Sequence, residues 1–279
     1  VTDHHDSATM STSTSTSTTA AGQGDALRGR TVVVTGANTG IGAAIARACG
    51  AAGANVVIDY VVHPELNADI VGDIEASGGH ADAVQDDILV VDGVNDLVAQ
   101  AVARFGRIDV FVNNAGVETR QSLLDTTEAD FDRVIGIDLK GAYFGAQAAA
   151  KQFVAQGGGG VIVNISSVHE DWPMPGNAAY CVAKGGMRML TRTAGVELGA
   201  HGIRMVGVAP GAVNTPINAK TMADPAKTKA LNDAIPLGRV ADPEEVAAAV
   251  VFVASDAGSY LTASTLFVDG GIMQGSVGL

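Results

Sequence analysis

Basic side chains, cysteines and long hydrophobic runs are all scarce in this chain of 279 residues. Its 17 lysines and arginines face 30 aspartates and glutamates, which gives a formal net charge of −13. Such a surface offers little attraction to nucleic acid or to an anionic membrane, because both need clustered positive charge. No apolar run approaches the roughly twenty residues that cross a bilayer, and the N-terminus lacks the basic-then-apolar pattern of a secretory signal. We therefore expect a soluble, cytoplasmic enzyme or small-molecule binder, without a nucleic-acid or membrane partner.

The two cysteines, Cys49 and Cys181, lie within apolar helical patterns. This predicts buried thiols rather than a disulfide framework or a metal site, in agreement with a reducing cytoplasm. His4 and His5 stand in a small, polar, repetitive stretch, and no third metal ligand lies near them. Residues 1–26 are therefore predicted to be a disordered Ser/Thr-rich tail without a metal site.

Residues 27–279 are predicted to form one doubly wound α/β domain around a parallel sheet. Short runs of valine and isoleucine alternate with longer helical patterns, and such continuous apolar runs indicate strands covered by helices on both faces. A chain of this length buries enough surface for one large core, and no linker or internal repeat divides it. The expected strands are 31–36, 55–62, 81–85, 108–114, 160–166, 202–210 and 264–271. The expected helices are 41–53, 64–79, a long one after Thr127, 178–199 and one that opens at 242.

A glycine-rich loop, TGANTGIG, joins the first expected strand to the first expected helix. Its backbone amides would face a pyrophosphate at the helix N-terminus. Gly40 lets the backbone approach the phosphates, and Gly42 lets the helix and strand pack closely. A plain tight turn would also use these glycines, and the missing Gly-Lys-Ser/Thr ending argues against a mononucleotide P-loop. The predicted cofactor-binding residues of this loop are Gly36, Asn38, Thr39, Gly40, Ile41 and Gly42.

Asp59 and Tyr60 lie near the end of the second expected strand, where a dinucleotide site chooses between NAD and NADP. A carboxylate accepts from the ribose 2'-hydroxyl of NAD, whereas the 2'-phosphate of NADP requires a cation. The following residues, Val61 and Val62, carry no charge, and neither does Thr39. We predict NAD as the preferred cofactor, with NADP as the second choice, unless Asp59 points into the sheet or caps a neighbour.

The segment SSVHEDWPMPGNAAYCVAK contains Ser167, Tyr180 and Lys184. A free tyrosine has a pKa near 10, so a catalytic tyrosine needs a neighbouring cation that stabilises its phenolate. Lys184 follows Tyr180 by one helical turn and shares its face, while Ser167 follows a strand at the same crevice, where its hydroxyl can hold the reacting oxygen. A solvated Tyr–Lys surface pair and an N-capping serine are the alternatives.

With these motifs in order, the chain resembles the short-chain dehydrogenase/reductase family from about residue 28 to residue 279. The likeness rests on TGANTGIG at 35–42, NNAG at 113–116, Ser167 with YCVAK at 180–184, and PGAVNTP at 210–216. It implies a single Rossmann-type domain with a seven-stranded parallel sheet, usually assembled as a tetramer. It also implies that Tyr180 is the general acid/base, that Lys184 lowers its pKa and anchors the ribose, and that Ser167 donates to the substrate oxygen.

The resemblance implies further cofactor contacts after the later strands. Asp87 matches the acid that meets the adenine amino group, although Asp86 beside it could share or take that role. Asn113 would steady the central sheet. The Pro-Gly turn after the sixth strand would precede the nicotinamide contacts, although any turn after a strand uses such residues. Besides Tyr180 and Lys184, the implied cofactor-binding residues are Asp87, Ile88, Asn114, Ala115, Gly116, Pro210, Gly211, Val213 and Thr215.

One position departs from the family pattern, which generally has Asn where this chain has Asp138. The family's residue holds a water in the proton relay behind the lysine, so Asp138 is included among the predicted catalytic residues. An ionised aspartate only accepts hydrogen bonds and adds a negative charge. Near Lys184 it would offset part of the lysine's effect on Tyr180 and raise the pH needed for catalysis. Alternatively, it keeps the water in place and changes little.

Within the family the likeness is strongest to bacterial glucose 1-dehydrogenases, through NNAGVE, SSVHEDWP, GAVNTPINA and LFVDGG. A sugar needs several polar groups beside the hydride acceptor. Trp172 and Pro173 would add a stacking face for the ring, unless they only pack the loop. The predicted substrate residues are Glu118, His169 and Asn218, with Glu170 at the same edge.

The predicted reaction is the NAD-dependent oxidation of a sugar or secondary alcohol, which for glucose gives the lactone. One alternative is a 3-oxoacyl thioester or general ketone reductase of the same family, with a more apolar pocket. The other is a non-catalytic NAD-binding regulator, against which the intact Ser167, Tyr180 and Lys184 argue.

Overall fold

Seven strands form one parallel sheet in the order β3-β2-β1-β4-β5-β6-β7 in the computed structural model, which describes residues 23–275. The chain winds from β1 toward one edge and returns to build the other edge from β4, so the strand order reverses between β1 and β4. The predicted doubly wound, seven-stranded sheet is therefore confirmed. The strands are β1 (Thr31–Val34), β2 (Asn55–Tyr60), β3 (His80–Gln85), β4 (Val110–Asn113), β5 (Gly160–Ile165), β6 (Ile203–Pro210) and β7 (Ser264–Val268).

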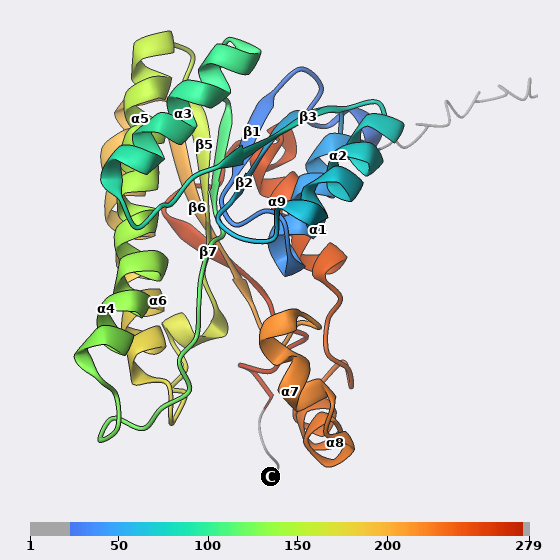
Figure 1. The fold of residues 1–279 in the computed structure, drawn as a ribbon, viewed down its shortest axis with the longest axis vertical. Coiled ribbons are helices and arrows are strands. Elements are labelled where there is room, and N and C mark those ends of the chain that lie inside the picture. The colour runs from blue at the N-terminus through green and yellow to red at the C-terminus, as the bar shows by residue number, and fades with distance from the viewer. Residues whose placement is uncertain (1–22, 276–279) are drawn as a thin grey trace, which may run out of the picture.

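Helices cover both faces of the sheet (Figure 1). On one face lie α1 (Gly40–Ala51), α2 (Asn67–Ala76) and α9 (Pro243–Ala254). On the other lie α3 (Val91–Phe105), α4 (Glu128–Ile135), α5 (Ala142–Gln156) and α6 (Ala178–Glu197). Val32 and Val34 pack in the core of the first face, and Val33 packs in the core of the second. Because successive strand side chains point to opposite faces, an unbroken valine run fills both cores at once.

Most strands and helices begin or end within a few residues of the predicted bounds, and three segments differ in kind. The helix expected at 64–79 begins as a 3-10 helix, Pro64–Leu66, before α2. The long helix after Thr127 is α4 and α5 joined by a π-helix, Gly136–Gly141. Residues 216–234, for which no element was predicted, form a 3-10 helix (Pro216–Asn218), α7 (Ala219–Met222) and α8 (Pro225–Ala234). None of the three contains a fully buried residue, so they leave little apolar periodicity in the sequence.

The first described element lies slightly before the predicted tail boundary, since Gln23–Asp25 form a 3-10 helix and Leu27 is fully buried. The rest of the predicted tail, with His4 and His5, lies outside the described residues. Between residues 23 and 275, no helix combines the length and the hydrophobicity that a membrane crossing requires.

Both cysteines are free. Cys49 is buried, as predicted, but Cys181 is partly exposed. The buried face of α6 carries Ala179, Ala183 and Met187, and Cys181 lies off that stripe.

Candidate active site

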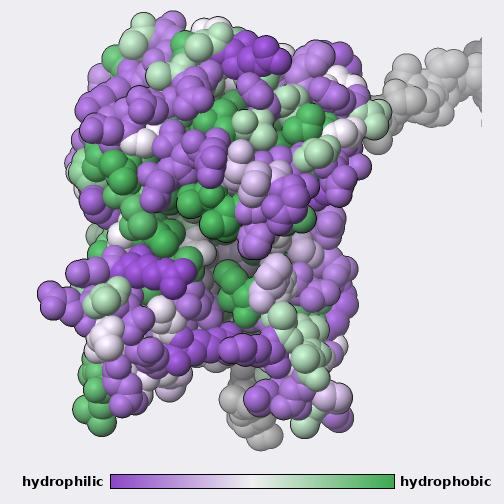
Figure 2. All heavy atoms as spheres, in the orientation of Figure 1, coloured by the Kyte–Doolittle hydropathy of each residue, from purple (hydrophilic) through white to green (hydrophobic). Residues whose placement is uncertain are grey.

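A cavity of about 880 Å³ opens beyond the carboxyl ends of the strands, where the sheet order reverses. Figure 2 shows the molecule hollowed between the two groups of helices and the α7–α8 segment, with hydrophobic and hydrophilic residues at the rim. Every residue predicted as catalytic lines this cavity. So do Glu118, His169 and Asn218, and so does every predicted cofactor-binding residue except Tyr60.

Tyr60 and Glu170 are corrections to the predicted site, because neither lines the cavity. Asp59 and Val61 do line it, and alternation along the strand turns the intervening Tyr60 the other way. Glu170 ends a 3-10 helix, Val168–Glu170, that packs against α6. Its buried side chain lies 3.7 Å from the Nε atom of Arg188, so it belongs to the packing behind the cavity.

The glycine loop is held in shape by backbone conformation and by the strand beside it. Gly36 and Gly40 have φ angles of 58° and 51°, a left-handed conformation that favours glycine. A Cβ atom at Gly42 would lie 2.3 Å from the Gly36 carbonyl oxygen and 2.5 Å from the Asn114 side-chain nitrogen. Asn114 uses that nitrogen to donate to the carbonyl oxygens of Thr35, at 2.8 Å, and Gly36, at 3.1 Å. The N-terminus of α1 therefore meets the cavity through a fixed loop, as a pyrophosphate site requires.

Asp59 holds this loop and lines the cavity. Its Oδ2 accepts from the Gly36 backbone N–H at 3.1 Å, while the buried Oδ1 has no hydrogen-bond partner among residues 23–275. Burial of the carboxyl raises its pKa from the usual 3.8 to about 7, against the effect of the Gly36 hydrogen bond. Of the interpretations that the sequence left open, the structure shows that Asp59 caps a neighbour, the Gly36 N–H, and its contact with a cofactor ribose stays a prediction.

Of the two acids after β3, Asp87 lines the cavity and Asp86 does not. Asp86 accepts from the Asp87 backbone N–H at 2.9 Å and so shapes the turn. Asn113 has the supporting position that the resemblance implied: its amide donates to Asn164 at 2.8 Å, and Asn164 donates to Thr191 on α6 at 2.8 Å. This buried chain of polar groups links β4, β5 and α6 beneath the site.

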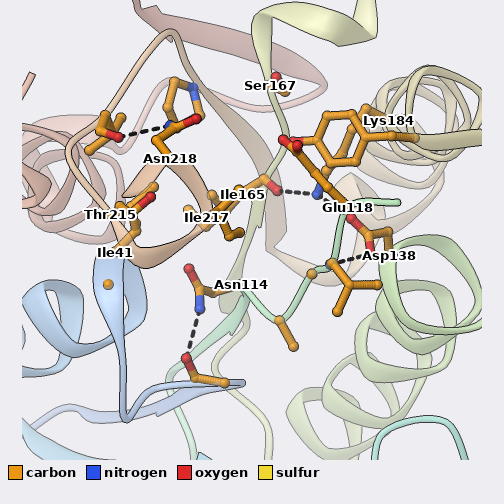
Figure 3. A pocket seen from close by; sticks show the side chains of 18 of the residues that line it. Ile41, Asn114, Glu118, Asp138, Ile165, Ser167, Lys184, Thr215, Ile217 and Asn218 are labelled. Atoms are coloured by element: carbon orange, nitrogen blue, oxygen red, sulfur yellow. Dashed lines mark hydrogen bonds and ion pairs between the residues drawn. The ribbon is translucent and has the colours of Figure 1, made fainter. Parts of the chain in front are cut away.

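Ser167, Tyr180 and Lys184 meet at the cavity. Tyr180 and Lys184 lie one turn apart on α6, and the lysine Nζ is 5.3 Å from the centre of the tyrosine ring. Ser167 lies close enough to Tyr180 for its side chain to lower the pKa of the phenol, and it also caps the 3-10 helix that follows it, where its Oγ accepts from His169 N–H at 3.1 Å. Capping and a place in the cavity are therefore compatible for this serine. Lys184 donates to the Ile165 carbonyl at 3.2 Å, which directs the ammonium toward the end of β5 (Figure 3).

Asp138 reaches the same group from the π-helix between α4 and α5. Its side chain is fully buried, with Oδ1 accepting from the Val117 N–H at 2.8 Å and Oδ2 lying 3.2 Å from Lys184 Nζ. A Cβ atom at Gly116 would come within 2.9 Å of Oδ2, so the glycine makes room for the carboxylate. Single π-turns inside long helices occur frequently at functional sites.

The charges of this group act on one another. Burial of the Tyr180 hydroxyl raises its pKa above the ordinary value, Lys184 opposes that rise, and Asp138 adds to it. Burial of Lys184 by itself lowers its pKa, but Asp138 and Tyr180 leave it raised. Burial likewise raises the pKa of Asp138, with Lys184 acting in the opposite direction. Lys184 thus acts on the pKa of Tyr180 in the predicted direction, and burial of the hydroxyl acts against it.

A polar bridge joins two of the loops that line the cavity. Arg120 Nε lies 3.0 Å from Glu118 Oε2, and its Nη2 donates to Asn218 Oδ1 at 3.4 Å. Glu118 and Arg120 follow β4 and Asn218 follows β6, so the bridge joins two segments far apart in the sequence; in Figure 3, Glu118 lies on the side of Lys184 and Asp138, and Asn218 on the side of Thr215 and Ile217. The His169 ring is 6.3 Å from that of Tyr180, measured between centres, and its Nδ1 is 3.0 Å from the Trp172 carbonyl oxygen.

Several lining residues were missed by sequence reasoning. Arg120 lies two residues after Glu118, which is a signal that could have found it. Others come from separate segments and carry no common motif: Ser166, Arg133, Thr221 and the apolar residues Met174, Pro175, Ile217, Leu231 and Ile272, which with Trp172 we call the apolar wall. Of the wall, only Trp172 was predicted at the cavity.

A doubly wound sheet with a glycine loop at its switch point, and a Ser–Tyr–Lys group in the same cavity, defines a nicotinamide-dependent oxidoreductase of the Rossmann type. A family model described as "Enoyl-(Acyl carrier protein) reductase" matches residues 36–273. The chain belongs to the short-chain dehydrogenase/reductase family.

Curated relatives within the family act on different alcohols. The chain is 46% identical over 248 residues to 3beta-hydroxysteroid dehydrogenase 1 of Eggerthella lenta, covering 89% of this chain and 95% of that protein. It is 41% identical over 246 residues to L-rhamnose 1-dehydrogenase (NAD(P)(+)) of a Sphingomonas strain, covering 88% and 97%. It is 37% identical over 247 residues to glucose 1-dehydrogenase 2 of Bacillus subtilis, covering 88% and 95%.

A crystal structure of a short-chain type dehydrogenase/reductase from Mycobacterium marinum superimposes with a TM-score of 0.84, at 33% identity, over 90% of this chain and 98% of that one. The predicted family is therefore confirmed, with glucose dehydrogenases among the similar proteins. The L-rhamnose 1-dehydrogenase carries NAD(P)(+) in its name, and a similar solved structure, a putative 2-deoxy-d-gluconate 3-dehydrogenase from Agrobacterium tumefaciens, holds bound NADP.

Proposed function

We propose that the protein oxidises a secondary alcohol on a ring, with Tyr180 as the proton acceptor and NAD as the preferred cofactor. The observation that carries this proposal is the meeting of Ser167, Tyr180 and Lys184 in one cavity with the glycine loop. A non-catalytic nucleotide binder would have no need of that group.

The residues of the cavity fit a nicotinamide dinucleotide. Asp59 and Ser166 line it, and in the part of the chain that the structure describes their buried atoms Oδ1 and Oγ have no hydrogen-bond partner, which suits a polar ligand. The amides at the start of α1 would hold the pyrophosphate, Asp59 the adenine ribose and Asp87 the adenine. Val213 and Thr215 would hold the nicotinamide end. When bound, the cofactor supplies the hydride acceptor.

The protein's own side chains then position the substrate and accept its hydroxyl proton. Ser167 donates a hydrogen bond to the substrate oxygen and fixes its position. Tyr180, as phenolate, takes the hydroxyl proton while the carbinol carbon gives up its hydride, so the alcohol loses two electrons and two hydrogens. Lys184 stabilises the phenolate and donates to the ribose hydroxyls. The reverse proton transfer would serve the reduction of a ketone.

The substrate we propose first is a sugar of the glucose type. Glu118, Arg120, His169 and Asn218 supply polar groups that suit ring hydroxyls, and two relatives are named as sugar 1-dehydrogenases. The second candidate is a larger alicyclic alcohol. It is favoured by the apolar wall, which a steroid-like ring system would cover better than a monosaccharide, and by the relative named as a 3beta-hydroxysteroid dehydrogenase.

A substrate panel separates these candidates. Purified protein with NAD or NADP is offered glucose, rhamnose and a 3β-hydroxysteroid, and with the reduced cofactors an acetoacetyl thioester, while reduced-cofactor absorbance is followed. We expect NAD-dependent oxidation of at least one sugar. Turnover of the steroid alone would replace the sugar proposal by the second candidate, preferential thioester reduction would indicate a ketone reductase, and no turnover at all would favour a regulator.

Asp59 is expected to set the cofactor preference at a cost in stability. Its pKa is near 3.8 when unfolded and about 7 when folded. The folded state therefore binds the proton more strongly than the unfolded state. The free energy of unfolding falls as the pH rises from about 4 to about 7, and the whole destabilisation from ionised Asp59 is present above about pH 7. Asp59→Asn, which keeps an acceptor for the Gly36 N–H, should raise the melting temperature at pH 8 by at least about 3 °C and leave it nearly unchanged at pH 4.

The same substitution should weaken NAD binding and raise the ratio of NADP to NAD efficiency, because a negative charge beside the 2'-phosphate is removed. Differential scanning fluorimetry at both pH values and kcat/KM with each cofactor check the two effects. Equal use of NADP by the wild type would contradict the predicted preference for NAD.

We also propose that the protein is a cytoplasmic homotetramer. Two separate surfaces support the assembly: α5 and α6 expose Tyr143, Val154, Val182 and Met189, and the edge strand β7 exposes Leu266 and Phe267 beside Phe252 of α9. Two different self-complementary surfaces are what a tetramer with crossed twofold axes requires. Native mass spectrometry of the purified chain tests the number of subunits, and a monomer at micromolar concentration would contradict it.

A further inference from the structure

A buried ion pair lies directly behind the proposed acid–base residue. Asp138 Oδ2 is 3.2 Å from Lys184 Nζ, and the two side chains are 0% and 4% exposed. The lysine Nζ is 5.3 Å from the centre of the Tyr180 ring, so the ammonium faces a carboxylate on one side and the phenol on the other. Any effect of this pair on catalysis rests on the proposed role of Tyr180 in proton transfer.

The carboxylate is fixed where it is by the fold. The π-helix projects Asp138 inward, its other oxygen is occupied by the Val117 N–H, and Gly116 leaves the space it fills. Lys184 has one further partner, the Ile165 carbonyl at 3.2 Å, which accepts a hydrogen bond but carries no full charge. The pair therefore persists whether or not Tyr180 is ionised, and much of the ammonium's charge is compensated before the phenol loses its proton.

The other charged groups do not restore a positive field at the phenol. Glu118, from the loop after β4, raises the pKa of Tyr180, Lys184 and Asp138, although Arg120 pairs with it at 3.0 Å. From the loop after β5, His169 presents an imidazole ring 6.3 Å from the Tyr180 ring, measured between centres. The titratable and charged groups that act on the phenol or lie beside it are thus Lys184 on α6, Asp138 on the π-helix, Glu118 with Arg120, and His169, and Arg133 of α4 also lines the cavity.

We propose that Asp138 is a positioning residue that acts through Lys184: its carboxylate neutralises part of the ammonium's charge, so that Tyr180 gives up its proton only at a higher pH than it would beside a neutral residue. Asp138 itself does not touch the substrate. It sets the pH range in which alcohol oxidation runs and confines that reaction mainly to alkaline conditions.

A second consequence concerns the cofactor's charge. When Tyr180 is ionised, the two negative charges of Asp138 and the phenolate exceed the one positive charge of Lys184, so these three side chains together carry a net charge of about −1. The ring of the oxidised nicotinamide is a cation. Oxidised cofactor should therefore favour ionisation of Tyr180, and by reciprocity the ionised protein should bind oxidised cofactor more tightly than the neutral one. The affinity for NAD⁺ should rise with pH, whereas the affinity for uncharged-ring NADH should change little.

The direct test is an ultraviolet titration of tyrosinate in the absence of substrate. The difference between each protein and its Tyr180→Phe partner isolates Tyr180 from Tyr60, Tyr143 and Tyr260. Asp138→Asn should move this ionisation toward acid by about one pH unit, which means about tenfold more phenolate at a given pH below it. Glu118→Gln is the matched control, also carboxylate to amide, and should move it less, because Arg120 already compensates Glu118.

Asp138→Ser provides a second neutral variant in case the asparagine is poorly accommodated, and far-ultraviolet circular dichroism checks the fold of each. Asp138→Asn and Asp138→Ser should also move the rising limb of the pH profile of kcat/KM to lower pH. The pH at which the affinity for NAD⁺ increases should move by the same amount. Unshifted titrations in two folded neutral variants, or a shift equal to that of Glu118→Gln, would overturn the proposal. Because the titration needs no substrate, a failure of the proposed function would show instead as absent turnover with a normal tyrosine titration.

Discussion

Replacing Tyr180 by phenylalanine is expected to lower kcat for alcohol oxidation by about 10²–10⁴-fold, the usual contribution of a positioned acid–base group. The ring itself should stay in place, because it packs against Val134, Ala179 and Ala183, and phenylalanine keeps that contact. The affinity for NAD should change little at pH values below the one at which Tyr180 ionises. Initial rates of NADH formation and a fluorescence titration with NADH measure the two quantities.

The control for this substitution is Tyr143→Phe. Tyr143 lies on α5, is half exposed and does not line the cavity, so its phenol takes no part in the proposed chemistry. Wild-type rates are expected from it. A Tyr180→Phe protein that keeps more than about a tenth of the wild-type rate would remove the tyrosine from the proton transfer.

Substituting Gly42 by alanine is expected to abolish dinucleotide binding and destabilise the fold by about 1–3 kcal/mol. The added Cβ would lie 2.3 Å from the Gly36 carbonyl oxygen, which is backbone and cannot turn away, and 2.5 Å from the Asn114 amide that holds the loop. The loop must then move away from the start of α1, and the amides that would face the pyrophosphate lose their arrangement. Thermal melting and the NADH dissociation constant report the two effects.

Gly72→Ala is the matched control, since it makes the same change on an exposed turn of α2 where a Cβ atom meets nothing within 4 Å. Alanine is the better helix former, so we expect a gain of up to about 1 kcal/mol with unchanged cofactor affinity. Equal behaviour of the two alanine variants would show that the close approach at Gly42 is not needed.

Features that depend on a local sequence pattern could be predicted well from the sequence. Val32, Val33 and Val34 form an unbroken apolar run, and a strand buried on both faces is the simplest structure that needs one. The spacing of Tyr180 and Lys184 predicts that they share a helical face, and both line the cavity. The glycines of the loop likewise predict its backbone conformation, since Gly36 and Gly40 have positive φ angles.

Positions that depend on tertiary packing were harder to predict. Glu170 follows the same strand as His169, yet the short 3-10 helix directs it toward Arg188 and away from the cavity. The apolar wall includes Leu231 from α8 and Ile272 from the segment after β7. No sequence pattern indicates that these two segments lie at the same cavity. Burial of the Tyr180 hydroxyl, which opposes the effect of Lys184 on its pKa, is likewise a property of the assembled site.

In the proposed reaction a hydride leaves a ring alcohol in this cavity while Tyr180 takes the proton. The decisive measurement is the mass of the reduced cofactor formed from an active alcohol of the panel that carries deuterium on its carbinol carbon. We expect the cofactor to gain that deuterium and none from deuterated water. Reduced cofactor without the label, or an oxidised alcohol that leaves the cofactor unchanged, would contradict the proposed hydride transfer.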